Sequence, residues 1–532
     1  MRSRIVLPAA LAVLVASMLP YGPALAAGGC DPTWRIVSAP PRARGGLVGV
    51  EAVAADDVWA VGGTANGGPG LVLHWNGTTW KRMRTGTAID IFGAVSASGP
   101  NDVWISSDER DVPRFVHWDG SSWTVFRGPR LSRMAHVVFG LEAIAPDDAW
   151  AVGYYAIKQA PFDVALILHW DGAAWTAMPP PADGIETPFL LDVAALAAND
   201  VWAAAWSDQP YLQWDGAAWS HVSGGGPTDL TSMRGLGAGG GSLWAVGQRF
   251  TSGLFAERWN GKAWLRTPAP AAAIIVTPED IASVGRGDAW AVGSEEKSPT
   301  TSRAAIVHDD GASLVQVPVP DPAASSGLAD TDALPNGTLW TVGWQWNGLE
   351  GSPARPLILR LCEIRVGDAG FSRSSASVPP GSEVAFGMPA RNAGRHSVTD
   401  DSGLGLFDSG PVSPGGSFLA SFPGAGRYPL TDTETGNGMV VRVPVRARPS
   451  AGAITDTFRI LWAGGPPPVG LVYDVQVLRP GSASWERWRW GVTFGTAKFA
   501  PDAGAGTYEF RARMRGAGAA SGWSPSRSIS VG

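Results

Sequence analysis

The sequence predicts an all-β protein in which seven repeated four-stranded units are followed by two β-sandwich domains. Three observations predict this fold class. A tryptophan motif recurs seven times, a Gly-containing turn follows six of these motifs at a similar place, and the composition changes after about residue 365. At 532 residues the chain is also too long for one compact core, so several domains are expected.

Residues 1–26 have the pattern of a secretory signal peptide. Arg2 and Arg4 precede an apolar run, and Ala24-Leu25-Ala26 forms a small-residue cleavage site. No later stretch is long and apolar enough to span a bilayer. The formal net charge of −6 argues against a nucleic-acid partner, which would require basic patches. We therefore expect a secreted, extracellular monomer that binds no nucleic acid and has no membrane span once the signal is removed.

The repeat is carried by a motif of the form DDVWAVG, which first occurs at residues 56–62. Its tryptophan returns with a mean period of about 47 residues, close to the length of repeats that form one four-stranded propeller blade each. We expect these tryptophans to be core residues that pack neighbouring units together. The seven are Trp59, Trp104, Trp150, Trp202, Trp244, Trp290 and Trp340.

A hairpin turn is expected between the last two strands of each unit. Asn-Gly or Asp-Gly occupies this place in six units, and both pairs tolerate the positive φ angle that a tight turn demands. The six turns begin at Asn76, Asp119, Asp171, Asp215, Asn260 and Asp310. The seventh unit has no such turn and no Trp-led strand after it, so it lacks its outer strand.

The segment that opens the mature chain supplies a candidate for the missing strand. When the repeats are aligned, Trp34 falls on Trp80, and both Cys30 and Cys362 fall on the turn position of Asn76. We expect Trp34 and its neighbours to form the outer strand of the seventh unit, with a Cys30–Cys362 disulfide in place of the covalent turn, as export permits. The alternative is that Cys30 is a lipoprotein cysteine, although the sequence before it lacks the usual Leu.

Residues 30–365 resemble the tryptophan-rich propeller repeats of secreted bacterial proteins. The resemblance implies a seven-bladed β-propeller and does not imply an activity, because propellers include both binding proteins and enzymes. Charged residues at even distances before the motif tryptophans are predicted to line a central tunnel. The candidate lining residues are Glu51, Glu142, Asp192, Arg234, Asp280 and Asp332, with Asp330 beside them. Two interpretations of this ring of charged residues are open: a solvated tunnel, or a site for a cation or another ligand.

Residues 366–446 resemble the cupredoxin family of blue-copper sandwiches. The segments VPPGSEVAF, NAGRHSVTDDSG and GMVVRVPV occur in the order typical of that family. The family's copper needs two His and one Cys. His396 matches the first His, whereas Asp432 and Thr435 stand where the Cys and the second His are expected, and Met439 is displaced by one position from the axial ligand. The resemblance therefore implies a sandwich without copper, and no cofactor is expected in the chain.

Residues 450–532 resemble a fibronectin type III domain, and residues 448–452 have the composition of a linker. Trp462, Tyr473 and the segment TYEFRARMRG match the buried Trp, the central strand and the Tyr-corner strand of that family. Three further tryptophans, Trp485, Trp488 and Trp490, alternate with Arg and Glu. Core packing explains one or two of them, and the third is a candidate contact residue, because aromatic and Arg side chains favour interfaces.

Two functional classes follow from these observations. No nucleophile elbow, zinc-ligand spacing or phosphate-binding loop occurs in a suitable context. This favours a non-catalytic binding or adhesion protein whose partner is an extracellular glycan, the cell wall or a protein. The alternative is an exported enzyme that acts on glycans or cell-wall polymers at the tunnel mouth.

Overall fold

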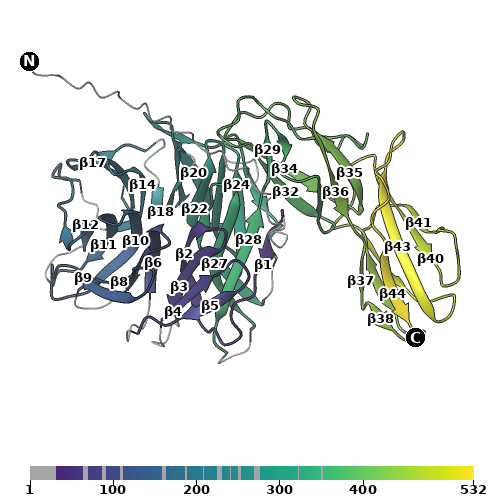
Figure 1. The fold of residues 1–532 in the computed structure, drawn as a ribbon, viewed down its shortest axis with the longest axis horizontal. Coiled ribbons are helices and arrows are strands. Elements are labelled where there is room, and N and C mark those ends of the chain that lie inside the picture. The colour runs from purple at the N-terminus through teal and green to yellow at the C-terminus, as the bar shows by residue number, and fades with distance from the viewer. Residues whose placement is uncertain are drawn as a thin grey trace, which may run out of the picture. The chain divides into compact units, whose positions relative to one another are not determined.

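The computed structural model describes residues 32–63, 70–86, 92–107, 112–158, 163–185, 189–207, 209–224, 230–239, 241–249, 253–268, 276–320, 323–348 and 352–532. The predicted signal peptide and Cys30 lie outside these residues. The described residues form strands and no helices, so they contain no helix that could cross a membrane. Figure 1 shows the order of the strands along the chain.

Seven four-stranded antiparallel sheets occupy residues 35–362. In six of them the four strands are consecutive in the chain. The first sheet consists of β2 (Gly46–Ala54), β3 (Asp57–Gly63), β4 (Leu71–Trp75) and β5 (Trp80–Met83). The second consists of β6 (Phe92–Gly99), β7 (Asp102–Ser107), β8 (Arg114–Trp118) and β9 (Trp123–Arg127). The third consists of β10 (His136–Ala145), β11 (Asp148–Tyr155), β12 (Val164–Trp170) and β13 (Trp175–Ala177). The next three are β14 (Leu190–Ala197), β15 (Asp200–Ala205), β16 (Tyr211–Trp214) and β17 (Trp219–Val222); β18 (Leu230–Gly239), β19 (Ser242–Arg249), β20 (Gly253–Trp259) and β21 (Trp264–Arg266); and β22 (Thr277–Gly285), β23 (Asp288–Ser298), β24 (Thr301–Asp309) and β25 (Leu314–Val317).

The seventh sheet joins the two ends of this region. Its strands are β26 (Ser325–Ala333), β27 (Thr338–Trp346), β28 (Arg355–Cys362) and, as the outer strand, β1 (Arg35–Ile36). β1 pairs antiparallel with β28, with Arg35 opposite Arg360. The first strand of each sheet contacts the first strand of the next sheet, and β26 contacts β2. The sequence-based prediction of repeated four-stranded sheets is confirmed, and the opening segment does supply the outer strand of the seventh sheet.

The six predicted turns share one structure, which explains why each begins with Asn or Asp followed by Gly. The Gly has a positive φ in each of them, between 81° and 94°. Each connection is a four-residue loop, and the side chain of its first residue accepts hydrogen bonds from the backbone N–H groups of the third and fourth. In the first loop Asn76 accepts from Thr78 and Thr79, at 3.2 and 3.0 Å. Asn and Asp are favoured here because they cap the turn in this way.

Edge-on tryptophan contacts hold neighbouring sheets together. The motif Trp on the second strand of a sheet meets a Trp at the outer strand of the next sheet, with ring centroids 5.3–5.7 Å apart and interplanar angles of 73–90°. The fifth sheet instead packs Trp244 in one hydrophobic cluster with Leu314. The pairs are Trp59–Trp123, Trp104–Trp175, Trp150–Trp219, Trp202–Trp264, Trp290–Trp34 and Trp340–Trp80. The motif tryptophans are buried core residues, as the sequence predicts.

Four further sheets occupy residues 364–531. The first two are β30 (Gly370–Phe371), β29 (Ile364–Gly367), β32 (Ser382–Gly387) and β34 (Ser417–Phe422); and β31 (Ser375–Ser377), β36 (Gly438–Val443), β35 (Gly426–Thr431) and β33 (Thr399–Asp400). The last two are β37 (Arg446–Arg448), β39 (Phe458–Leu461) and β42 (Thr496–Phe499); and β38 (Ala451–Gly452), β44 (Arg527–Val531), β43 (Gly506–Arg515), β40 (Val472–Leu478) and β41 (Glu486–Val492).

These four sheets share one hydrophobic core, which runs from Ile364 to Val531. The Ala425 backbone N–H donates to the Trp462 carbonyl at 2.6 Å, and isolated bridges join Gly424 to Ala463 and Arg427 to Gly522. Strands β37 and β38 lie on either side of the segment 449–450, within the predicted linker of residues 448–452. This segment is therefore short and is bounded by a strand on each side.

Removal of a motif tryptophan should destabilise the ring of sheets. Trp202 is fully buried against Trp264, so Trp202→Ala leaves a large cavity and should reduce the free energy of unfolding by about 3–5 kcal/mol. Thermal and denaturant unfolding measure this change. The matched control is Trp206→Ala, because Trp206 is 54% exposed and its loss should change stability by less than about 0.5 kcal/mol. Equal effects of the two substitutions would contradict the assignment.

Candidate functional site

The first strands of the seven sheets line a common cavity. It has a volume of about 140 Å³, and all of β2, β6, β10, β14, β18, β22 and β26 contribute to its wall. The neighbouring strands approach closely enough to require glycine. A Cβ at Gly140 would lie 2.8 Å from the Asp192 Cα, and one at Gly235 would lie 2.6 Å from the Asp280 Cα.

Six carboxyl groups converge on this cavity. They comprise five of the six residues predicted to line a tunnel, together with Asp330. The six are Glu51, Glu142, Asp192, Asp280, Asp330 and Asp332. Among the described residues that line the cavity there is no His, Lys, Arg, Cys or Tyr.

Arg234 does not line the cavity, and the register of its sheet explains why. In β14 and β22 the residue opposite the motif Trp lies eight positions before it, whereas in β18 Gly237 lies only seven positions before Trp244. Counting back from Trp244 therefore overshoots by one residue. Arg234 falls at the register shift between Met233 and Gly235, and its guanidinium contacts Glu279, which occupies the equivalent shift of the next sheet, at 3.4 Å.

The cavity carboxylates bridge neighbouring sheets. Each of five accepts a hydrogen bond from a backbone N–H on the first strand of the next sheet, a strand that has no further strand on that side. The donors are Leu236 to Asp192 (2.7 Å), Thr331 to Asp280 (3.0 Å), Val50 to Asp330 (2.5 Å), Ala52 to Asp332 (2.7 Å) and Ala195 to Glu142. These bonds satisfy N–H groups that would otherwise be left unpaired at an inner sheet edge.

Burial raises the pKa of these carboxyl groups. Asp280 is buried and the other five residues are half-buried, and the carboxyl groups lie close to one another inside the cavity wall, so the ionised form is disfavoured. Burial raises the pKa of Glu142 to about 8, and Asp332 adds to the increase, although a hydrogen bond from the Ala195 backbone opposes it. Burial, followed by repulsion from Asp332 and Glu142, also raises the pKa of Glu51 well above its ordinary value.

No group of three or more His, Cys, Asp or Glu side chains in the described part of the chain is arranged to hold a metal ion. In the cavity, five of the carboxylates already accept backbone hydrogen bonds. Because burial raises their pKa values, carboxyl groups such as Glu51 and Glu142 hold protons at a higher pH than ordinary carboxyl groups do.

An exposed aromatic stripe begins at the wall of this cavity. It consists of Phe139, Tyr154, Phe189 and Trp206, and we call it the aromatic stripe. Phe139 lines the cavity at the register shift of β10, and its ring lies 5.8 Å from Tyr154. Tyr154 lies 5.0 Å from Phe189, which lies 5.5 Å from Trp206. Phe139 and Trp206 are 44% and 54% exposed, so both ends of the aromatic stripe reach solvent.

The His residues before the outer tryptophans have a structural role. His74 stacks on Trp59 with centroids 4.2 Å apart, and its Nε2 lies 2.8 Å from Asp57. The second, third and sixth sheets repeat this Asp–Trp–His arrangement. In the fifth and seventh sheets Ser242 and Thr338 replace the Asp, and an Arg lies over the motif Trp instead. These histidines therefore orient the motif tryptophans and the Asp side chains of the core.

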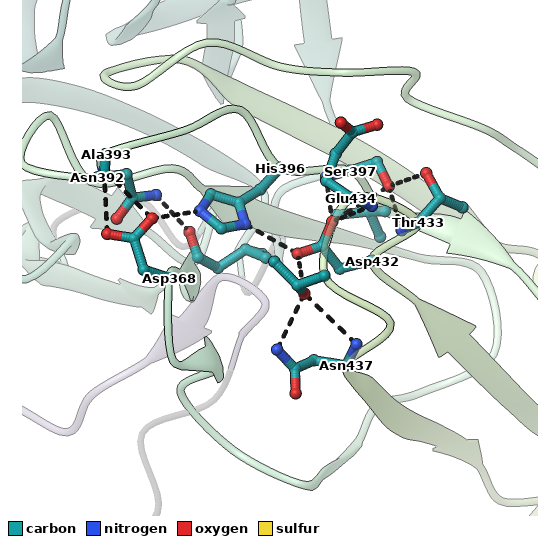
Figure 2. Close-up of polar contacts among 12 residues, drawn as sticks. Asp368, Asn392, Ala393, His396, Ser397, Asp432, Thr433, Glu434 and Asn437 are labelled. Carbon is teal, nitrogen blue, oxygen red and sulfur yellow. Dashed lines mark hydrogen bonds and ion pairs between the residues drawn. The ribbon is translucent and has the colours of Figure 1, made fainter.

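The positions that match copper ligands do come together, but as a closed hydrogen-bond network (Figure 2). The buried His396 bonds through Nδ1 to Asp432 at 2.8 Å and through Nε2 to Asp368 at 3.2 Å. Thr435 donates to Asp432 at 2.7 Å. With both ring nitrogens engaged and no thiolate, these residues do not fit a blue-copper centre.

Asp432 is the centre of this network. It is fully buried, and it accepts hydrogen bonds from the Thr435 hydroxyl, the His396 ring and the Ser397 backbone. Burial acts to raise the pKa of Asp432, but these hydrogen bonds outweigh burial and lower the pKa below its ordinary value. Met439 packs in the hydrophobic core rather than in this network. An ionised Asp432 thus holds together the segments that contain His396, Ser397 and Thr435.

No protein-family model matches the chain, and a search among curated proteins finds no match.

The cavity carboxyls should make the protein less stable as the pH rises. Because their pKa values are higher in the folded state, folding favours bound protons, and this stabilisation is lost as the pH increases from about 4.5 through about 8. Each unit of difference in pKa between the folded and unfolded states corresponds to about 1.4 kcal/mol. We expect the melting temperature to fall over this range, and Glu142→Gln to weaken the fall because an amide does not ionise. The exposed Asp147→Asn is the control and should leave the pH profile unchanged.

The His396 network should not bind copper. Full-length protein incubated with Cu(II) and dialysed should retain no stoichiometric copper and show no blue absorption, because no free imidazole nitrogen or thiolate is present at this site. Metal analysis and visible spectroscopy measure both properties. The variant Asp432→Cys with Thr435→His supplies a thiolate and a second imidazole beside His396 and should gain a thiolate charge-transfer band. Stoichiometric copper that is lost in His396→Ala would contradict this prediction.

Proposed function

We propose that this chain is an exported, extracellular binding protein that engages glycans without catalysis. In this proposal the seven sheets are the blades of a seven-bladed β-propeller, and residues 366–446 and 450–532 are cupredoxin-like and fibronectin type III-like sandwiches. The closed series of contacts from β2 to β26 and the shared core of the C-terminal sheets support this architecture. The protein acts as a secreted monomer.

The aromatic stripe is the observation that carries the proposal. Four aromatic rings from two neighbouring sheets extend from the cavity wall to the surface, and exposed apolar patches of this kind mark binding sites. Aromatic faces pack against the C–H faces of sugar rings, and the carboxyl oxygens in the cavity wall are acceptors for sugar hydroxyls. The combination suits a glycan chain whose end reaches the cavity.

The cavity is a less suitable site for catalysis. Its volume of about 140 Å³ is below the several hundred Å³ of typical small-molecule pockets. Five of its six carboxylates are already hydrogen-bonded to backbone N–H groups. The alternative function, an exported enzyme acting on glycans or cell-wall polymers, is favoured by Glu142, because a carboxyl with a pKa of about 8 is protonated at neutral pH and can donate a proton.

The proposal includes a Cys30–Cys362 disulfide that fixes the outer strand of the seventh sheet. The pairing of β1 with β28 brings the residues just after Cys30 next to the strand that ends in Cys362. Cys362 is buried, and its Sγ lies 3.3 Å from the hydroxyl oxygen of Thr338. The described residues contain no free cysteine, but Cys30 lies outside them, so the disulfide remains a prediction.

Glycan binding is tested with the full-length mature protein on a glycan array, followed by titration of the best ligand. Trp206→Ala and Phe189→Ala should weaken binding about tenfold or more, because exposed aromatic anchors dominate such contacts. The matched control is Phe494→Ala, which removes a ring of similar exposure (48%) elsewhere and should bind normally.

Two outcomes would contradict the proposal. One is the absence of any glycan that depends on Trp206. The other is turnover of a bound glycan that is abolished by Glu142→Gln, which would establish the enzyme instead.

A further inference from the structure

A second surface of this protein combines arginine with tryptophan. It lies on the outer face of the five-stranded sheet formed by β38, β44, β43, β40 and β41. Strand β43 alternates between buried residues such as Phe510 and Ala512 and partly exposed residues that point away from the core. The outward residues of β43 are Glu509, Arg511, Arg513 and Arg515.

The arginines and tryptophans on this face stack alternately. The Arg511 guanidinium lies over both Trp485, at 4.3 Å, and Trp523, at 4.7 Å. The Arg513 guanidinium lies over Trp523, at 4.6 Å, and Trp490, at 5.7 Å. Arg487, on the edge strand β41, lies 4.2 Å from the Trp490 ring. We call this surface the Arg–Trp ladder, and its members are Trp485, Arg511, Trp523, Arg513, Trp490 and Arg487.

Polar groups in the same sheet fix the arginines in place. The fully buried Asp474 accepts hydrogen bonds from Arg513, at 3.3 Å, and Arg515, at 2.8 Å, and these ion pairs help lower the pKa of Asp474 against the effect of burial. The Gln476 side chain accepts from Arg511 at 2.9 Å. Each guanidinium carries five N–H donors, and these contacts use at most two of them, while the side chains of Arg511, Arg513 and Arg515 remain partly exposed.

The charge of this region is opposite to that of the rest of the chain. Residues 446–532 contain eleven Arg and Lys against five Asp and Glu, a net charge of +6, whereas the whole chain has a net charge of −6. The net charge of the whole protein therefore conceals a basic C-terminal region. On the outer sheet face, Asp474 and Glu509 are outnumbered by Arg487, Arg511, Arg513 and Arg515.

We infer that the Arg–Trp ladder is a docking surface for a linear anionic polysaccharide. Outward residues two positions apart on a strand are spaced by about 7 Å, so Arg511, Arg513 and Arg515 form a straight row of donors. Guanidinium groups bind carboxylate or phosphate groups through paired hydrogen bonds, and stacking on tryptophan holds their planes in fixed orientations. A row of this kind fits repeated charges along an extended chain.

The same geometry argues against other partners. Nucleobases bind single-strand readers by stacking on free aromatic faces, but Trp523 lies between two guanidinium groups. Protein interfaces usually have an apolar centre that excludes water, whereas this face presents charged groups and the serines Ser528 and Ser530. The surface is separate from the aromatic stripe, so this inference goes beyond the proposed function and does not depend on it.

The test uses polygalacturonate as the anionic probe and full-length protein at low salt. The control ligand is the same polymer with methyl-esterified carboxylates, which keeps the sugar backbone and removes the charge. We expect the protein to bind the acid and not the ester, and to release the acid as salt increases. A cell-wall polymer that carries phosphate groups is tested in parallel. Comparison of its affinity with that of polygalacturonate shows whether phosphate or carboxylate is preferred.

Three variants locate the site. Arg487→Gln and Arg511→Gln should each weaken binding about tenfold, because each removes a charge-assisted donor from the row. Arg487 is exposed at the edge, so its loss should leave the melting temperature unchanged even if Arg511→Gln lowers it. The matched control is Arg459→Gln, since Arg459 is also exposed but lies on β39 in the other sheet.

Three results would overturn the inference. The first is the absence of binding to either anionic polymer. The second is equal weakening by Arg459→Gln, which would indicate attraction to net charge rather than to the Arg–Trp ladder. The third is tighter binding of single-stranded DNA with the same dependence on Arg487, which would make nucleic acid the partner.

Discussion

The edge-on contact between tryptophans of neighbouring sheets is the interaction on which the seven sheets of residues 35–362 depend. Each sheet is too narrow to bury both of its faces alone, so it is stable only between two neighbours. A Trp on the second strand fills the space beneath the outer strand of the next sheet, and the contact at Trp290–Trp34 extends the series to the strand that precedes all the repeats. Because every sheet depends on the next, a closed set of seven leaves no sheet face uncovered.

The sequence predicts the repeated sheets well, because their signals are local. The motif tryptophan, the Asn-Gly or Asp-Gly turn and strand alternation all operate within one repeat. The prediction that Arg234 lines the cavity is wrong, because the signal that decides its position is not local to the motif. Its position depends on a β-bulge that precedes the turn in β14 and β22 but is absent from β18, and a shift of one residue changes which side chain reaches the cavity. Residue counting cannot detect this shift, because the segment Trp-Ala-Val-Gly of the motif is the same in this repeat as in the first.

The surfaces that we associate with binding leave almost no trace in the sequence. Phe139, Tyr154, Phe189 and Trp206 come from four separate places in the chain and share no spacing. Trp523 lies more than thirty residues after Trp490, yet both rings border Arg513. The sequence does predict that Trp485, Trp488 and Trp490 differ in role. Trp488 packs against the core, whereas Trp485 and Trp490 belong to the Arg–Trp ladder.

The origin of the seventh sheet has a consequence for the order in which the protein folds. Strand β1 leaves the ribosome before every other described strand, but its partner β28 follows more than 300 residues later. Six sheets can form as they are made, each from consecutive strands, whereas the seventh must wait with its outer strand already synthesised and unpaired. During that interval the growing chain has open sheet faces at both ends. Completion of the ring is therefore a late, long-range step, and the chain is most prone to association with other chains just before it.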